Sequence, residues 1–369
     1  MLESRPGRRA AIVAGIRTPF AKSGTVFRNT PAVALARHAA RELLYRAELD
    51  GHQVDQVIFG QVVTSVLTPN VAREVSLLPQ FPPSVPAYSL NRACSSAAQA
   101  VANAADQIVL GHADVILAGG VESLSDIPVL HSKRFSQLLV DASRARKLTQ
   151  RLSVLGRVRP RDLIPITPAI AEPSTGETMG QSAEKMAKEN GITREAQDEV
   201  ALRSHMRAAA GTADGRLTAE IAPWFGGRNF DEVITSDNGI RPDTSMEALA
   251  RLKPVFDRKY GSVTAGNSSP LTDGAAAVLV MSEEKARALG YEPLAYVRSY
   301  AVAAVDPGWQ LLQGPAIAVP RALKRAGITW NELGLLEIHE AFAAQVLSNI
   351  QAWGSQEWAT RLGLDGPLG

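Results

Sequence analysis

The 369-residue sequence contains one cysteine, Cys94, and its six histidines are scattered along the chain. A single cysteine excludes an internal disulfide framework and a cysteine-based zinc site, and no two histidines lie close together at metal-ligand spacing. No apolar run reaches the roughly 18 residues of a membrane-spanning helix, and the apolar run near the N-terminus is too short for a secretory signal. These absences predict a protein of the reducing cytoplasm that carries no metal.

A strong excess of charge is also absent, because the net charge is only +2. The totals therefore give no indication of nucleic-acid binding. An apolar content of 45% is ordinary for a globular protein. A chain of this length exceeds the size at which a single core keeps growing, which predicts two structural halves.

Short apolar runs predict buried strands, and helical patterns lie between several of them. We expect strands at 10–15, 56–62, 85–90, 114–119, 275–282, 294–302 and 334–339. We expect helices near 31–47, 71–79, 95–110, 178–190, 194–210, 314–325 and 341–352. The alternation of strands and helices predicts a layered α/β fold with mostly parallel strands.

This alternation breaks after Gly120, and the break predicts three segments. They cover residues 1–120, 121–248 and 249–369. Within the second segment, 131–161 holds nine Lys and Arg residues against one acid, with leucines interleaved. This composition predicts an amphipathic basic helix, whose simplest interpretation is a solvated surface.

Cys94 lies in the stretch "SLNRACSSAAQAV", between the predicted strand 85–90 and the predicted helix 95–110. Free N–H groups and the helix dipole favour an anion at a helix start, so a thiolate there should be a good nucleophile. The following helix is rich in alanine and can therefore pack closely on more than one side. The alternative for a lone cysteine is a buried structural residue.

Five segments of the sequence together resemble the thiolase family. They are "NRACSSAAQAV", "DVILAGGVESLSDIPVLHSK", the stretch 176–205, the stretch 249–286 with "VTAGNSSPLTDG", and "LEIHEAFAAQVLSN". The resemblance covers nearly the whole chain, and the five segments occur in the family's order. His-Glu-Ala-Phe in the last segment, with the basic insertion, is most similar to the β-subunits of fatty-acid oxidation complexes.

The resemblance implies a thiolase fold of five layers, αβαβα, built from two βαβαβαββ halves. The segment 1–120 would be the first part of the N-terminal half, 121–248 an insertion or loop domain, and 249–369 an incomplete C-terminal half. It also implies a 3-ketoacyl-CoA thiolase of fatty-acid β-oxidation, in which Cys94 becomes acylated and coenzyme A is a substrate rather than a cofactor. The alternatives are a biosynthetic acetoacetyl-CoA thiolase and a non-catalytic CoA-binding or assembly subunit.

The same resemblance assigns roles to a pair of residues near the C-terminus. His339 would help form an oxyanion hole, and Glu340 would support it. His339 is expected to end a strand and Glu340 to begin a helix, which would place both in the ligand crevice of an α/β sheet. The alternative is a core histidine beside an ordinary helix-start charge.

Five further residues match positions that bind coenzyme A in the family. Ser269 would approach the pantetheine amide, Ala265 and Gly266 would keep that wall thin, Met179 would pack near the thioester, and Arg241 would lie near the adenine. For Ser269 the alternative is a turn residue, and for Arg241 a solvated loop charge.

Two motifs of the family are absent from these residues. Thiolases carry a Gly-His-Pro segment, whose histidine takes the proton of the nucleophile, and a Cys-x-Gly segment, whose cysteine acts as the second acid and base. No histidine follows His339 and no cysteine follows Cys94. The resemblance therefore implies a truncated chain, inactive by itself.

The resemblance also sharpens the interpretation of the segment 131–161, which becomes an acyl-chain lid that meets a membrane surface or a partner subunit. The expected partners are 3-ketoacyl-CoA and CoA, a second copy of the chain in a homodimer, and a hydratase/dehydrogenase α-subunit. Nucleic acid is not expected, because no recognised binding motif accompanies the basic charge.

Overall fold

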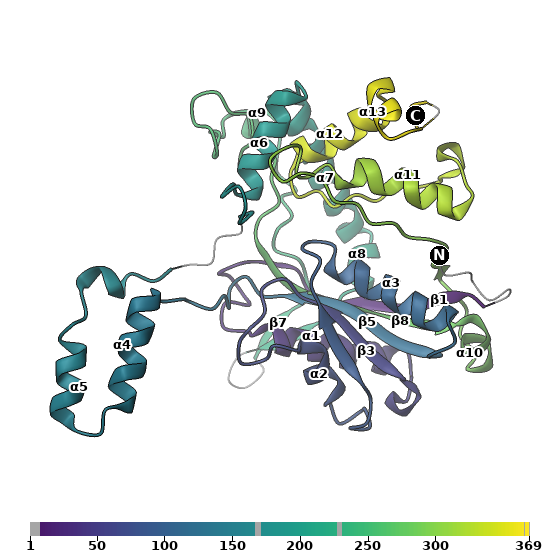
Figure 1. The fold of residues 1–369 in the computed structure, drawn as a ribbon. Coiled ribbons are helices and arrows are strands. Elements are labelled where there is room, and N and C mark those ends of the chain that lie inside the picture. The colour runs from purple at the N-terminus through teal and green to yellow at the C-terminus, as the bar shows by residue number, and fades with distance from the viewer. Residues whose placement is uncertain (1–7, 167–170, 227–230, 365, 369) are drawn as a thin grey trace.

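The computed structural model describes residues 8–166, 171–226, 231–364 and 366–368 (Figure 1). The strands are β1 (Ala10–Arg17), β2 (Ala21–Lys22), β3 (Gln56–Gly60), β4 (Ala87–Leu90), β5 (Val115–Glu122), β6 (Trp224–Gly226), β7 (Glu232–Ile234), β8 (Thr272–Ser282) and β9 (Ala295–Tyr296). The α-helices are α1 (Ala32–Arg46), α2 (Val71–Ser76), α3 (Ser96–Val109), α4 (Lys133–Arg144), α5 (Leu148–Leu155), α6 (Met179–Glu189), α7 (Arg194–Ala213), α8 (Arg216–Ala219), α9 (Met246–Ala250), α10 (Glu283–Ala288), α11 (Gly314–Ala326), α12 (Ala343–Trp353) and α13 (Gln356–Arg361).

The main sheet has seven strands in the order β4-β3-β5-β8-β1-β9, with β2 also paired to β8. β3 is parallel to β4 and β5, but β8 is antiparallel to β5 and β1, and β9 is antiparallel to β1. The prediction of mostly parallel strands is therefore wrong. The chain leaves the sheet at the end of β5 and re-enters at that same edge, where Glu122 pairs with Gly274, so β8 must run back along β5.

Helices cover both faces of this sheet. Val57 and Phe59 on β3 pack in the cluster that includes α1 and α2, whereas Ile58 between them packs with α3 on the opposite face (Figure 1). Both faces of the central strands are buried, which explains why these strands are apolar runs without alternation. Burying one such side chain contributes about 1.5–3 kcal/mol, so these strands anchor the fold.

The start of α3 lies directly against the ends of β3 and β5. A Cβ atom on Gly60 would lie 2.4 Å from the carbonyl carbon of Ser96, and one on Gly120 would lie 2.6 Å from the Cβ atom of Ala97. Glycine at both strand ends is thus required for this close approach. The two glycines thereby set the position of the loop that carries Cys94.

The opposite side of α3 is covered only in part. Near the end of the helix, Tyr300 donates a hydrogen bond of 2.6 Å to Asp106. At its start, Ala97 and Ala98 are exposed. The expected close packing on more than one side of α3 is therefore found only near the C-terminal end of the helix.

The predicted strands of the later part of the chain differ from the structure. The run 294–302 forms only the short strand β9, and 334–339 forms no strand. A strand needs a neighbour for its N–H and C=O groups, and among the described residues none pairs with 334–339. The described part of the chain contains a two-stranded sheet of β6 and β7 beside the main sheet, but no second large sheet.

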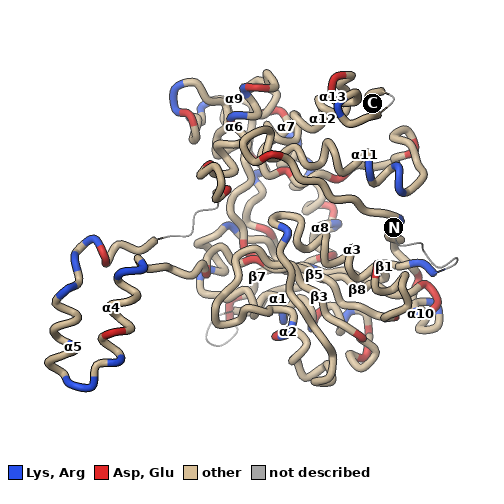
Figure 2. The backbone as a smooth tube through the Cα atoms, in the orientation of Figure 1, with Lys and Arg blue, Asp and Glu red and all other residues tan. Residues whose placement is uncertain are grey.

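The basic segment 131–161 forms a helical hairpin of α4 and α5 that extends away from the body (Figure 1). The prediction of one amphipathic helix is wrong, because the chain folds back after Arg144 and buries Leu138 and Ala142. An ion pair between Arg134 and Asp162 closes the base of the hairpin. Other Lys and Arg residues are spread along the hairpin and at its tip (Figure 2).

Candidate active site

Cys94 is exposed and lies two residues before the start of α3. The Ser96 hydroxyl accepts the N–H of Arg92 at 2.8 Å and donates to the carbonyl of Ala93 at 2.6 Å, while Ser95 donates to the carbonyl of Arg92 at 2.9 Å. Ala93 has a φ of 45°, a left-handed conformation that costs an L-residue about 1–2 kcal/mol. The alternative of a buried structural cysteine is wrong, because this fixed turn presents the thiol to solvent.

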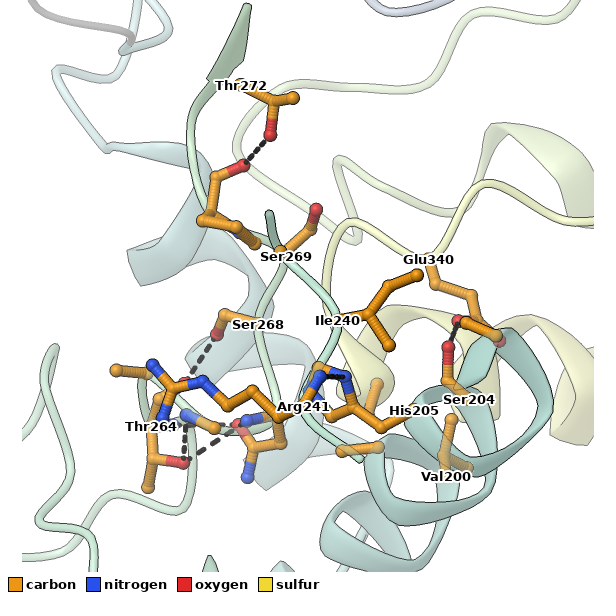
Figure 3. Close-up of a pocket in the computed structure, with 18 of the residues that line it drawn as sticks. Val200, Ser204, His205, Ile240, Arg241, Thr264, Ser268, Ser269, Thr272 and Glu340 are labelled. Atoms are coloured by element: carbon orange, nitrogen blue, oxygen red, sulfur yellow. Dashed lines mark hydrogen bonds between the residues drawn. The ribbon is translucent and has the colours of Figure 1, made fainter. Parts of the chain in front are cut away.

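A pocket of about 700 Å³ lies between α7, the loop before β8 and the segment before α12 (Figure 3). It brings together six of the residues proposed from the sequence: Arg241, Ala265, Gly266, Ser269, His339 and Glu340. Cys94 and Met179 are not among the residues that line it. The pocket therefore unites the expected coenzyme A positions with the expected oxyanion pair, but not with the cysteine.

Two segments far apart in the sequence meet at this pocket through main-chain hydrogen bonds. The N–H of Ser269 donates to the carbonyl of Ala341 at 2.9 Å, and the N–H of Ala343 donates to the carbonyl of Asn267 at 3.0 Å. Asn267 is buried, and its side chain donates to Asp198 on α7 at 2.9 Å. The loop that carries Ser269 is thus fixed to the segment that carries the oxyanion pair.

His339 and Glu340 line the pocket, but their local structure differs from the prediction. α12 begins only at Ala343, and no strand ends at His339, so Glu340 does not begin a helix. Glu340 instead accepts a hydrogen bond of 2.5 Å from Ser204 on α7 (Figure 3). Both residues are exposed, which makes the alternative of a core histidine wrong.

His205 is a pocket residue that the sequence reasoning missed, although it ends the quoted stretch 176–205. Its Nδ1 atom accepts the main-chain N–H of Arg241 at 3.3 Å (Figure 3). Burial lowers the pKa of His205, and the positive charges of Arg241 and Lys22 lower it further. The lining of the pocket holds two basic residues, Lys22 and Arg241, and two acidic residues, Asp237 and Glu340.

The glycine at position 266 serves packing beside the pocket. A Cβ atom there would lie 2.5 Å from Leu252 and 2.7 Å from Leu249, so glycine lets the loop approach α9. A similar contact explains Gly180, where a Cβ atom would lie 1.9 Å from the ring of Phe256, a residue that lines the pocket. The start of α6 therefore contacts the pocket through Phe256.

Cys94 and the pocket lie at the same edge of the sheet. β3, β4 and β5 end at this edge, since Gly60 pairs with both Leu90 and Gly120, and β8 begins there. Cys94 follows the end of β4, and Ser269 precedes the start of β8. Open α/β sheets usually bind ligands outside the carboxyl ends of their strands, which is the end of the sheet where both features lie.

No group of three or more His, Cys, Asp or Glu side chains in the described part of the chain is arranged to hold a metal ion. Within the same residues, no helix combines the length and the apolar character needed to cross a membrane.

Comparison with known families identifies two matching domains. The thiolase N-terminal domain matches residues 10–284, and the thiolase C-terminal domain matches residues 291–364. The first match ends after β8, in keeping with the place of that strand in the main sheet. The three segments predicted from the sequence, with boundaries after residues 120 and 248, stay predictions.

Similar proteins support the same family. A 3-ketoacyl-CoA thiolase of Aeromonas salmonicida is 48% identical over 363 residues, which cover 97% of this chain and 82% of that protein. A 3-ketoacyl-CoA thiolase of Yersinia enterocolitica is 49% identical over 363 residues with the same coverage.

Solved structures are similar over nearly the whole chain. The acetyl-CoA acetyltransferase of Bacillus anthracis has a TM-score of 0.81 at 35% identity, covering 97% of this chain and 84% of that one. Human mitochondrial 3-ketoacyl-CoA thiolase in complex with CoA has a TM-score of 0.78 at 31% identity, covering 97% and 83%. The expected thiolase fold is confirmed, and the chain belongs to the thiolase family.

Proposed function

We propose that this chain is a 3-ketoacyl-CoA thiolase, an acyltransferase of fatty-acid breakdown. It would cleave a 3-ketoacyl-CoA with free CoA, giving acetyl-CoA and an acyl-CoA shortened by two carbons. The observation that carries the proposal is the exposed thiol of Cys94, which a fixed turn holds at the same sheet edge as the pocket. The 3-ketoacyl-CoA thiolases at 48–49% identity support it.

The reaction would proceed in two steps through Cys94. The thiolate attacks the C3 carbonyl, and the C2–C3 bond breaks to leave the acyl group on sulfur and an enolate of acetyl-CoA, which must accept a proton. The thiolate of a free CoA then attacks the acyl-Cys94 thioester and releases the cysteine. CoA is therefore a substrate in this proposal, and no further cofactor is invoked.

The pocket would hold the CoA moiety. Ser269 is exposed on the loop that lines the pocket and would meet the pantetheine amide, while Arg241 and Lys22 would contribute positive charge for phosphate groups. Ala265 and Gly266 line the same wall. A contact of Met179 with the thioester remains a prediction, because Met179 lies at the start of α6 and outside the pocket lining.

His339 should stabilise the oxyanion that forms when the thioester or ketone is attacked. Replacing His339 with alanine should lower the rate of acyl transfer from acyl-CoA to Cys94 by roughly ten- to a thousandfold, the range for losing one oxyanion donor. Because Cys94 is the only cysteine, the mass of the intact protein reports this transfer directly.

The matched control for this substitution is His112→Ala, which removes an exposed histidine outside the pocket lining. It should leave the acylation rate unchanged. An unchanged rate in His339→Ala, together with a large fall in melting temperature, would favour a structural role for His339 instead.

A biosynthetic acetoacetyl-CoA thiolase is the second candidate, favoured by the similarity to the acetyl-CoA acetyltransferase of Bacillus anthracis. The two candidates differ in the acyl group that they accept. A fatty-acid thiolase should transfer medium or long acyl groups to Cys94 at least as fast as acetyl groups. Acylation restricted to acetyl-CoA would support the biosynthetic function.

The helical hairpin of α4 and α5 would dock an anionic membrane surface or a hydratase/dehydrogenase subunit. Leu148 and Leu152 are 72% and 60% exposed on α5, and Lys and Arg residues occur along the same hairpin (Figure 2). Each Lys or Arg near anionic lipid contributes about 1 kcal/mol, and salt weakens this attraction. Arg134 is excluded from this role because it pairs with Asp162.

Replacing four basic residues of the hairpin with glutamine should therefore weaken flotation with anionic liposomes or co-purification with the subunit. The four are Arg144, Arg146, Lys147 and Arg151. Acylation of Cys94 by short acyl-CoA should not change. The matched control replaces four exposed basic residues of the body: Arg287, Arg321, Lys324 and Arg325. If flotation or co-purification fell equally in the hairpin variant and the control variant, or in neither, the hairpin would be interpreted as a solvated lid.

Two further expectations stay predictions. The first is a homodimer, and the second is a location in the cytoplasm. Gel filtration with light scattering would measure the first, and fractionation of cells that express the protein would measure the second.

A further inference from the structure

The loop that carries Cys94 is connected to a carboxylate on a neighbouring strand. Glu122 is the last residue of β5, and its carboxylate accepts the main-chain N–H groups of Val62 at 2.9 Å and of Val63 at 3.1 Å. These two residues follow β3, which lies beside β5 in the sheet. Glu122 thus fixes the turn that leaves β3 at the edge where Cys94 lies.

A second set of hydrogen bonds connects this turn to the cysteine. The side-chain amide of Asn91 donates to the carbonyl of Val62 at 3.0 Å, and its oxygen accepts the N–H of Ala93 at 3.0 Å. Ala93 is the residue with the left-handed backbone, immediately before Cys94. Asn91 therefore joins the turn held by Glu122 to the residue that sets the direction of Cys94.

The position of Glu122 is unfavourable for an isolated carboxylate. Burial raises the pKa of Glu122, and the charge of Asp273 raises it as well, while the two main-chain N–H groups act in the opposite direction. Asp273 is occupied by hydrogen bonds from the N–H and the hydroxyl of Ser125. The hydrogen bonds to the turn after β3 are therefore the interactions that favour a charged Glu122 here.

We infer that Glu122 and Asn91 form a relay that positions Cys94 for acyl transfer. Both are positioning residues, because they act through Val62 and Ala93 and do not line the pocket. This inference rests on the proposed function, in which Cys94 accepts the acyl group. The inference predicts that substitutions of Glu122 or Asn91 lower the limiting rate of acylation. They should not change the acyl-CoA concentration that gives half of the limiting rate.

Two single variants break the relay at different points. Glu122→Ala removes the acceptor for the turn after β3. Asn91→Asp keeps the oxygen that accepts from Ala93 but removes the N–H donor to Val62, and because Asn91 is exposed this change should leave folding intact. Each should lower the limiting rate of acylation about tenfold, because a small misplacement of a reacting group is costly.

The double variant tests whether the two residues act as one unit. Glu122→Ala with Asn91→Asp should also be slowed about tenfold, because breaking a relay twice adds little, whereas independent effects would multiply to about a hundredfold. Glu122→Gln keeps one acceptor oxygen and should recover most of the rate. The matched control is Glu332→Gln, which changes a carboxylate that accepts the N–H of Thr329 far from the cysteine in the sequence, and it should have no effect.

The relay would be overturned if the effects of the two substitutions multiplied in the double variant. It would also be overturned if both single variants were acylated at the wild-type rate. The relay would also be overturned if the variants changed the limiting rate and the half-saturating acyl-CoA concentration by the same factor, in parallel with their melting temperatures. If the wild-type protein itself is not acylated at Cys94, the proposed function fails. If it is acylated and the variants behave like it, only the relay fails.

Discussion

Replacing Cys94 with serine should lower the rate of acyl transfer from acyl-CoA by at least about a thousandfold, because a serine hydroxyl is a far weaker nucleophile than a thiolate without a base to activate it. The thiol is accessible to acyl-CoA, since Cys94 is exposed on the turn that precedes α3. The measurement is the mass of the intact protein as a function of time after mixing with acyl-CoA.

Two controls separate chemistry from folding in this experiment. Because serine differs from cysteine by one atom at an exposed site, the melting temperature should not change. Binding of CoA should also persist, since Cys94 does not line the pocket. Acylation of the serine variant at the wild-type rate would exclude Cys94 as the nucleophile.

The 369-residue chain should show no steady thiolysis, although it accepts one acyl group. We propose this because the sequence has no second cysteine and no histidine after His339, and each missing proton-transfer group costs about 10²- to 10⁴-fold. Attack on an acyl-CoA releases a CoA thiolate, which needs little assistance from an acid. Cleavage of a C–C bond releases an enolate, which requires a proton donor.

The measurement is the disappearance of a 3-ketoacyl-CoA in the presence of CoA, compared with that catalysed by the 3-ketoacyl-CoA thiolase of Aeromonas salmonicida. The rate for the 369-residue chain should be at least about 10⁴-fold lower. Imidazole, added as a diffusible base, should accelerate the acylation of Cys94 in proportion to its concentration. Turnover comparable to that of the relative would show that other groups of this chain transfer the protons.

Much of the first sheet could be predicted from the sequence. The runs at 56–62 and 114–119 contain the uninterrupted apolar stretches 57–59 and 115–118 because both faces of β3 and β5 are buried, and this pattern is visible without a structure. The direction of β8 could not be predicted in the same way. The direction of β8 depends on where the chain returns to the sheet after the long segment that follows β5, and hydrophobic periodicity carries no information about that point.

Local patterns also fail where an element needs a distant partner. The run 334–339 contains Leu335, Leu336 and Ile338, yet it forms no strand because no neighbour among the described residues pairs with it. The pattern of leucines and basic residues in 131–161 predicts one helix, but burial of Leu138 favours a hairpin.

The sequence offered candidate site residues one by one, but not the contacts between them. Six of the residues selected by motif matches line one pocket, whereas Cys94 and Met179 do not. Motif matches could not reveal His205 as a neighbour of Arg241, since that contact joins α7 to a loop. Nor could they reveal Glu122, whose importance depends on its hydrogen bonds to the turn after β3.

The most direct test of the central claim is to locate the acyl group. After incubation with a medium-chain acyl-CoA, the intact protein should gain the mass of one acyl group, and proteolysis should place that group on the peptide that contains Cys94. Because the chain has no other cysteine, a thioester elsewhere is impossible. An acyl group on a different residue, or an unmodified protein that still binds CoA, would contradict the proposed function.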